Sequence, residues 1–293
     1  FFKFLRKDFK NLVIEIGGGH NSVSESIGLS GFKKDYKLIS FDPNGKKYSN
    51  PNHFIVKDFF SKKYVKKYKD KISLVIHSHL FEHIYDPNNF LTDINNSLKI
   101  GGLHIFSVPN LKSMIKNGYS NAMNFEHPYF LEESMIDYLL KKNGFKILKK
   151  RKYLNHSIFY KTKKTTNNPK KINVYRKFEI NKRLFKDYYR NLKKDINLIN
   201  KKIKTYQNVY LFGAHIFSQM LIFNGLNTSL IKNILDNDKK KHNQYLYGTK
   251  IKVVGTKNLR KVDKPIIILR AAQYSNEIKK QIIQKINKRT KFI

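Results

Sequence analysis

The sequence predicts an α/β protein of two domains, a larger one followed by a smaller one, each a parallel sheet with helices on both faces. Residues 12–14 and Ile16 form an apolar run that breaks on three consecutive glycines, as a buried parallel strand does where it turns into a helix. A second apolar run ends in Asp42, where a doubly wound fold has its second strand. The same order returns later, because one apolar run breaks at Gly213 and the next ends in Asp236.

Length and composition fit two folded domains rather than a disordered chain. Of the 293 residues, 40% are hydrophobic and 14% aromatic, which is enough to bury a sizeable core. There is no cysteine, so disulfides and thiolate metal sites are excluded within these residues. We predict the first domain at residues 1–160, a linker with a long helix at 161–206, and the second domain at 207–293.

The strongly basic charge is the feature that most suggests a nucleic-acid partner. The formal net charge is +38, but only 8 of the 59 basic residues are arginine, the residue that reads phosphate and guanine best. Lysines are spread through every segment beside abundant asparagine and isoleucine, which indicates a general residue bias. We expect nonspecific binding to polyanions, no specific nucleic acid, and a small anionic substrate.

No segment of the sequence resembles a membrane anchor or a signal peptide. No apolar run approaches the roughly 20 residues of a membrane span, and the first ten residues lack the apolar stretch of a signal peptide. We therefore expect a cytoplasmic protein. The sequence does not indicate an oligomeric state.

The glycine pattern distinguishes between kinds of cofactor. Glu15, Gly17 and Gly19 give E-x-G-x-G, whereas a dinucleotide site reads GxGxxG. The stretch resembles the first motif of the class I S-adenosylmethionine-dependent methyltransferases, which have a Rossmann-like sheet. The resemblance implies that S-adenosylmethionine is the cofactor, that the glycines lie under its methionine part, and that Asp42 binds its ribose.

Three further residues are candidates for the cofactor site. Asp58 follows an apolar run, and the resemblance implies that an acid there contacts the adenine amino group. A helix cap is the alternative role for Asp58. His77 and His79 follow the apolar residues 72–76, and we expect residues 77–80 to line the cofactor cleft.

Histidines and a glutamate crowd together after this run. His77, His79, Glu82 and His83 lie within seven residues, but no HExxH or comparable ligand pattern is present, so we predict no metal site. The pair Glu82-His83 resembles the fourth motif of the same family. The run from residue 74 to the Val-Pro-Asn at residue 110 also matches that family. We therefore predict that His83 contacts the substrate.

Two polar stretches flank the predicted cleft. Asn21, Ser22 and Ser24 are suited to cap the first helix. Residues 110–124 are predicted to be a polar loop of the kind that covers an active site.

The predicted catalytic residues lie just before another helix. This region resembles the nucleotide-sugar C-methyltransferases, in which a Glu-His pair at this place lies over the substrate and the histidine is the general base. Carried over, His127 is the base, Glu126 is its orienting partner and Tyr129 contacts substrate. Histidine suits proton removal at neutral pH. Asn124 stands where the family commonly has tyrosine, and a capping glutamate beside a surface histidine is the alternative interpretation.

The last part of the chain predicts a second Rossmann-like domain. Residues 161–171 are polar and contain proline, as linkers do, and residues 174–206 have helical apolar spacing. The remainder resembles the C-terminal domain of sugar C-methyltransferases. That resemblance implies a role on the substrate side of the cleft, with contacts from Gly213, His215 and Tyr274.

The function predicted from these observations is S-adenosylmethionine-dependent methyl transfer to a sugar. The substrate is expected to be a nucleotide-linked sugar of surface-glycan or deoxysugar biosynthesis. Two alternatives remain open at this stage. One is an O-methyltransferase of a capsule or lipopolysaccharide sugar, and the other is a non-catalytic basic protein that binds RNA or another polyanion on a methyltransferase scaffold.

Overall fold

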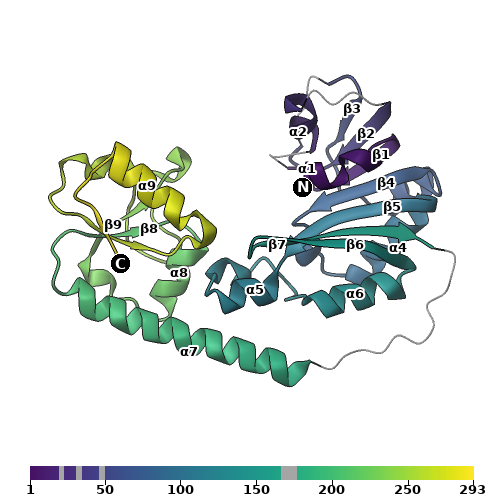
Figure 1. The fold of residues 1–293 in the computed structure, drawn as a ribbon. Coiled ribbons are helices and arrows are strands. Elements are labelled where there is room, and N and C mark those ends of the chain that lie inside the picture. Colours follow the sequence, from purple (N-terminus) through teal and green to yellow (C-terminus); the bar gives the residue numbers. More distant parts are fainter. Residues whose placement is uncertain (20–22, 31–34, 46–49, 166–176) are drawn as a thin grey trace. The chain divides into compact units, whose positions relative to one another are not determined.

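The computed structural model describes residues 1–19, 23–30, 35–45, 50–165 and 177–293 of the chain. The chain divides into two compact units (Figure 1). The first unit comprises residues 1–111 and 125–176, and the second comprises residues 112–124 and 177–293. Each unit has a sheet of its own with helices packed on it, which confirms the predicted α/β class.

The sheet of the first unit has seven strands in the order β3-β2-β1-β4-β5-β7-β6. The first five pair in parallel, and the pairs of β7 with β5 and β6 are antiparallel. The order reverses between β1 and β4, which is where ligands bind in open α/β sheets. The strands are β1 (Asn11–Ile16), β2 (Tyr36–Phe41), β3 (His53–Val56), β4 (Ile72–Ser78), β5 (Leu98–Pro109), β6 (Phe145–Tyr153) and β7 (Ser157–Lys164).

Helices cover both faces of this sheet. Ile14 and Phe41 belong to the core cluster that packs against α3, α4 and α6, whereas Val13 and Leu38 belong to the cluster that packs against α1 and α2. Successive strand residues point to opposite faces, so both faces of the central strands are buried. The helices are α1 (Phe2–Leu5), α2 (Val23–Leu29), α3 (Lys62–Tyr68), α4 (Pro87–Ser97) and α6 (Glu133–Lys142), with 3-10 turns η1 (Arg6–Asp8) and η2 (Phe81–His83).

The second unit has a five-stranded parallel sheet in the order β10-β9-β8-β11-β12. One face packs against α7 and α8, and the other packs against α9. The strands are β8 (Val209–Phe212), β9 (Ile231–Asp236), β10 (Val253–Gly255), β11 (Ile266–Leu269) and β12 (Lys291–Phe292). The helices are α7 (Phe178–Ile203), α8 (Ile216–Phe223) and α9 (Ser275–Lys285), with 3-10 turns η4 (Thr228–Leu230), η5 (Lys239–Lys241), η6 (Thr256–Lys261) and η7 (Ala272–Tyr274).

The segment predicted as a polar loop is largely helical. It forms α5 (Leu111–Lys116) and η3 (Ser120–Met123), in which Met114 and Ile115 are buried. Residues 112–124 belong to the second unit, where the Tyr188 hydroxyl of α7 donates to Ser120 Oγ at 3.1 Å. The loop prediction was wrong because the helical spacing of Leu111, Met114 and Ile115 covers only about one turn before Gly118 interrupts it.

The elements near the predicted linker differ in extent from the prediction. β7 runs to Lys164, so the first four residues of the predicted linker are strand. Ile196, Ile199 and Ile203 of α7 are buried in the core of the second unit, so this helix is part of that unit's fold. Residues 166–176 lie outside the described residues, as do the predicted caps Asn21 and Ser22 and the side chain of Ser24.

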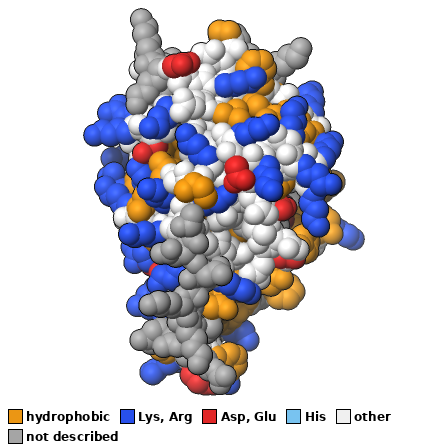
Figure 2. Space-filling view, turned by 90° about the vertical axis from the view of Figure 1, so that its right-hand side faces the viewer, with side chains coloured by type: hydrophobic (Ala, Val, Ile, Leu, Met, Phe, Trp, Pro, Cys, Tyr) orange, Lys and Arg blue, Asp and Glu red, His pale blue; other side chains and the backbone are white. Residues whose placement is uncertain are grey.

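The surface carries its positive charge widely. On the face seen in Figure 2, lysine and arginine side chains lie over the whole surface, with apolar and uncharged areas between them. This distribution matches the scatter of lysines along the sequence rather than a single basic stripe.

Among the helices that the structure describes, none combines the length and the apolar character needed to cross a bilayer.

Candidate active site

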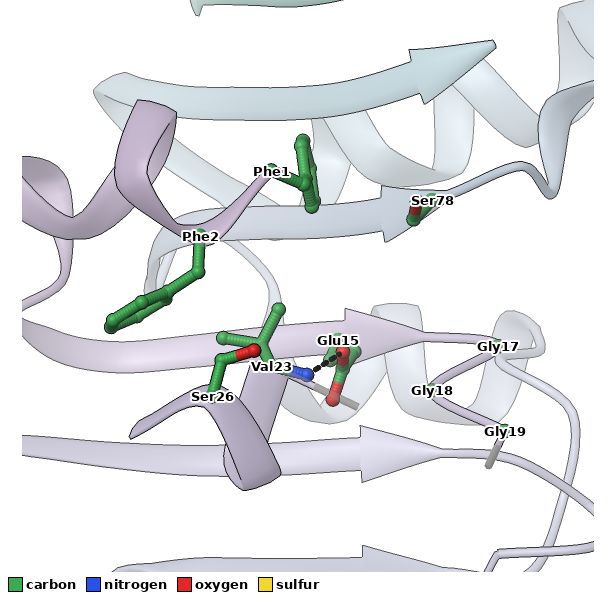
Figure 3. Close-up of a pocket in the computed structure, with 9 residues that line it drawn as sticks. All are labelled: Phe1, Phe2, Glu15, Gly17, Gly18, Gly19, Val23, Ser26 and Ser78. Atoms are coloured by element: carbon green, nitrogen blue, oxygen red, sulfur yellow. Dashed lines mark hydrogen bonds between the residues drawn. The ribbon is translucent and has the colours of Figure 1, made fainter. Parts of the chain in front are cut away.

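A cavity of about 340 Å³ opens at the carboxyl ends of β1 and β4, where the strand order reverses. Figure 3 shows the three glycines following the tip of β1 and Ser78 at the tip of β4. A volume of this size lies in the range of small-molecule sites. The lining residues are Phe1, Phe2, Glu15, Gly17, Gly18, Gly19, Val23, Ser26 and Ser78.

Glu15 ties the glycine turn to its surroundings. The side chain is 5% exposed, and its two oxygens accept hydrogen bonds from the Val23 amide at 3.0 Å and the Ser40 hydroxyl at 2.7 Å. Burial raises the pKa of the Glu15 carboxyl above its ordinary value. A Cβ on Gly18 would lie 2.9 Å from Glu15 Oε2, so the middle residue of the turn has no room for a side chain.

Asp42 is fixed beside the same turn. Its Oδ2 accepts from the Gly19 amide at 2.7 Å and its Oδ1 accepts from the Asn44 amide at 2.8 Å. Gly17 and Gly19 both have positive φ, 69° and 44°, which glycine adopts without steric strain. The carboxylate of Asp42 thus lies next to a residue that lines the cavity, at the place where a ribose is held in doubly wound folds.

Two of the predicted cofactor residues lie elsewhere. The exposed carboxylate of Asp58 accepts from Lys63 Nζ at 2.6 Å and from the Tyr64 hydroxyl at 2.9 Å, and the Lys63 bond is the main reason that its pKa is lowered. His77 is 1% exposed, stacks on Phe106 and shares a 2.9 Å hydrogen bond with His104. Neither residue lines the cavity, so the structure gives no support for a cofactor contact by either.

His79 links the cofactor cavity to a second group of residues. Its φ of 49° is in the left-handed region, its Nε2 lies 2.9 Å from Ser157 Oγ, and its Nδ1 lies 3.2 Å from Glu82 Oε1. The neighbouring Ser78 lines the cavity instead. His79 is thus bonded to Glu82 and Ser157 and is not among the residues that line the cavity.

Glu82, His83 and His127 come together within the first unit, and we call them the Glu-His-His cluster. One ligand-type atom from each of these side chains lies within 4.8 Å of the others. The rings of His83 and His127 meet edge to face with their centroids 4.7 Å apart. Burial lowers the pKa of His127 below its ordinary value. The side chains thus combine a buried carboxylate with two imidazoles at one point.

The predicted pairing of Glu126 with His127 takes a different form. Glu126 is exposed, and its backbone carbonyl lies 3.1 Å from His83 Nδ1. The carboxylate that shares a cluster with His127 is that of Glu82. Tyr129, assigned to substrate from sequence, is 45% exposed near this segment.

The second unit holds the other predicted substrate residues at the carboxyl edge of its own sheet. Gly213, with φ of 99°, follows β8, and His215 is the exposed N-cap residue of α8. Tyr274 is exposed at the start of α9, shortly after β11.

Sequence reasoning did not identify Phe1, Phe2, Val23 and Ser26 as cavity residues, because nothing in an isolated apolar or serine residue marks it as part of a lining.

The sheet order, the glycine turn and the cavity at the switch point together define the class I methyltransferase fold. Residues 3–150 match the model of a family described as methyltransferase domain, and residues 155–293 match the model described as C-methyltransferase C-terminal domain. The chain belongs to the methyltransferase family.

Similar solved structures cover a little over half of the chain. A SAM dependent methyltransferase from Archaeoglobus fulgidus is 18% identical, with a TM-score of 0.41 over 56% of this chain and 92% of that one. One from Aquifex aeolicus is 13% identical, with a TM-score of 0.42 over 55% of this chain and 87% of that one. The comparison with curated protein sequences found no match.

The residues around the cavity fit S-adenosylmethionine, the cofactor that the sequence resemblance implies. The turn at Gly18 excludes any side chain, so a ligand can approach the backbone closely. Glu15 and Asp42 are anchored by hydrogen bonds rather than free to move. Phe1, Phe2 and Val23 are the apolar residues of the same lining.

Proposed function

We propose that the chain transfers the methyl group of S-adenosylmethionine to a carbon atom of a nucleotide-linked sugar in surface-glycan or deoxysugar biosynthesis. The observation that carries the proposal is the meeting of His127 with Glu82 and His83 in the unit that contains the cofactor cavity. The match of residues 155–293 to a C-methyltransferase C-terminal domain supports carbon as the acceptor atom.

In this proposal the first unit holds the cofactor through Glu15, Gly17, Gly19 and Asp42. The cofactor supplies a methyl group attached to a positively charged sulfur. The chain's own contribution is to fix the turn and to hold the acceptor in line, which removes the entropic cost of bringing two reactants together.

His127 is the proposed general base. It accepts the proton that leaves the acceptor carbon as the new carbon–carbon bond forms. Glu82 lies in the same cluster, and its carboxylate stabilises the imidazolium that this proton transfer creates. Glu126 acts through its backbone, since its carbonyl fixes the ring of His83.

The second unit is proposed to contact the nucleotide part of the substrate. Gly213, His215 and Tyr274 lie at the carboxyl edge of its sheet, the edge at which ligands bind in this class of fold. Tyr129 and His83 of the first unit are proposed to contact the sugar.

The test is methyl transfer from labelled S-adenosylmethionine to a panel of sugar nucleotides, with the site of the new methyl group read by NMR. A methyl carbon bonded to carbon supports the proposal, whereas a methyl ether would replace it with O-methylation. Saturable binding to RNA without any cofactor binding would favour the polyanion-binding alternative.

A variant pair tests the role of His127. His127→Ala should abolish turnover and leave cofactor affinity within about threefold, because a base contacts only the acceptor. His242→Gln is the control, since His242 is a half-buried histidine of the second unit to which no substrate contact is assigned. Loss of cofactor affinity together with turnover in His127→Ala would mean that His127 is structural.

A further inference from the structure

The Glu-His-His cluster has the composition of a metal site that sequence spacing does not reveal. Its ligand-type atoms come from η2 and from the segment before α6, and they lie within 4.8 Å of one another. Three protein ligands around a zinc ion stand roughly 3.3 Å apart, given metal–ligand distances of about 2.0–2.2 Å. Small side-chain rotations therefore suffice to bring the three groups onto one ion.

Glu82 carries the first independent observation. Its side chain is 6% exposed, and its Oε1 faces His79 Nδ1 at 3.2 Å. Its Oε2 is fully buried and has no hydrogen-bond partner among the described residues. A buried carboxylate oxygen without a partner raises the free energy of the folded state. A bound cation is one of the ordinary reasons for such an oxygen in a native protein.

His83 carries the second observation. Its Nδ1 lies 3.1 Å from the backbone carbonyl of Glu126. A carbonyl only accepts hydrogen bonds, so in the neutral ring Nδ1 bears the hydrogen and Nε2 keeps its lone pair. Histidines that ligate metals are usually oriented in this way by a carbonyl or carboxylate on the other nitrogen.

The outer contacts of the cluster are also those of a metal site. His79 bridges Glu82 Oε1 and Ser157 Oγ, at 3.2 Å and 2.9 Å, so the carboxylate is oriented by a group behind it. Ligating carboxylates are commonly held in this manner. Two imidazoles and one carboxylate suit Zn²⁺ and related transition-metal ions better than Mg²⁺ or Ca²⁺, which take oxygen ligands.

We propose that the Glu-His-His cluster binds one Zn²⁺-class ion through Glu82 Oε2, His83 Nε2 and a ring nitrogen of His127, with positions left open on the ion. The ion takes the lone pair that His127 uses as a base, so metal binding and methyl transfer exclude one another. The exclusion of methyl transfer by the ion rests on the proposed function, whereas the binding of the ion does not.

Direct titration tests the binding. The full chain is stripped with EDTA and titrated with Zn²⁺ by calorimetry and with Co²⁺ by visible absorption, which reports the ligand field. We expect one site, weakened at least about tenfold in His83→Gln and in His127→Gln. His215→Gln, which removes an exposed histidine of the second unit, should bind the ion as the unchanged chain does.

The results of these titrations distinguish the binding of the ion from its effect on methyl transfer. Equal affinity in the unchanged chain and in both cluster variants, with native circular dichroism, would overturn the site. Glu82→Gln provides a second check, because it keeps the shape of the buried side chain and removes its charge. Where methyl transfer is detected, Zn²⁺ should inhibit it and EDTA restore it; loss of activity in EDTA would overturn the exclusion while leaving the site.

Discussion

The two units share one arrangement at the switch points of their sheets. In the first, the Gly17 amide donates to the Phe41 carbonyl at 2.9 Å and the Gly19 amide donates to Asp42 Oδ2 at 2.7 Å. In the second, the corresponding bonds run from Gly213 to Leu235 at 2.8 Å and from Ala214 to Asp236 Oδ2 at 2.7 Å. The strand orders correspond as well. An aspartate at the end of the second strand is thus a feature of the fold in both units.

The surroundings of the two aspartates differ. The first turn has three glycines and the buried acid Glu15 two residues before them, whereas Leu211 stands two residues before Gly213. Lys241 Nζ lies 3.5 Å from Asp236 Oδ2. The comparison teaches that the aspartate alone does not identify a cofactor site. The glycines and the acid in the strand carry that information.

The largest expected difference concerns cofactor binding by the two aspartates. Asp42→Asn should weaken S-adenosylmethionine binding by about 10- to 100-fold, because a hydrogen bond to a charged group contributes about 1.5–3 kcal/mol. Asp236→Asn, the matched change in the second unit, should leave the affinity unchanged. Calorimetric titration with the cofactor measures both. Equal loss in the two variants would show that the switch points do not differ in the way described.

The glycines provide the next comparison. Gly17 and Gly213 have φ of 69° and 99°, so alanine at either position should lower the free energy of unfolding by about 1–2 kcal/mol. Only at Gly17 would the new Cβ meet a neighbour, Leu80 Cδ1 at 3.1 Å. We expect both variants to unfold at lower denaturant concentration and only Gly17→Ala to lose cofactor affinity. Unchanged cofactor binding in Gly17→Ala would mean that the backbone of this turn does not contact the ligand.

The units should also respond differently to acid. Burial lowers the pKa of His77 to about 3 and that of His104 well below its ordinary value, whereas the second unit has no fully buried histidine among its described residues. In the unfolded chain each titrates near 6.5. These two histidines therefore do not lower the free energy of unfolding above about pH 6.5. They lower it progressively as the pH falls toward about 3.

Hydrogen exchange measures this difference. Between pH 6.5 and 5.5, His77 alone should lower the stability of the first unit by about 1 kcal/mol. Peptides from β4 and β5 should lose protection over this range, after correction for intrinsic exchange rates, while those from β8 and β9 keep it. The double variant His77→Leu with His104→Leu should reduce the loss to the part contributed by His53, a buried histidine of β3 whose pKa burial lowers to about 4. Parallel behaviour of the two sheets would contradict the assignment.

The comparison also shows which features the sequence can reveal. The strand that breaks on glycines and the strand that ends in Asp42 were predicted correctly, because both signals are local. His77 was assigned to the cleft because residues 72–76 are apolar except for Ser73, so their periodicity does not tell which side chain faces a ligand. The Glu-His-His cluster has no sequence signature, since the contact between His83 and Glu126 spans 43 residues.

The smallest expected effect concerns the long helix that distinguishes the second unit. Arg270, just after β11, donates to both carboxylate oxygens of Asp195 on α7, at 2.8 Å and 2.7 Å. Asp187 on the same helix pairs with the exposed Arg190, at 3.1 Å. Asp195→Ala should lower the free energy of unfolding of the second unit by about 0.5–1 kcal/mol, because the bidentate pair has favourable geometry although it is partly exposed. Asp187→Ala should change it by less than about 0.5 kcal/mol. Denaturant unfolding of both variants measures the difference, and equal values would show that the pair does not hold α7 against this sheet.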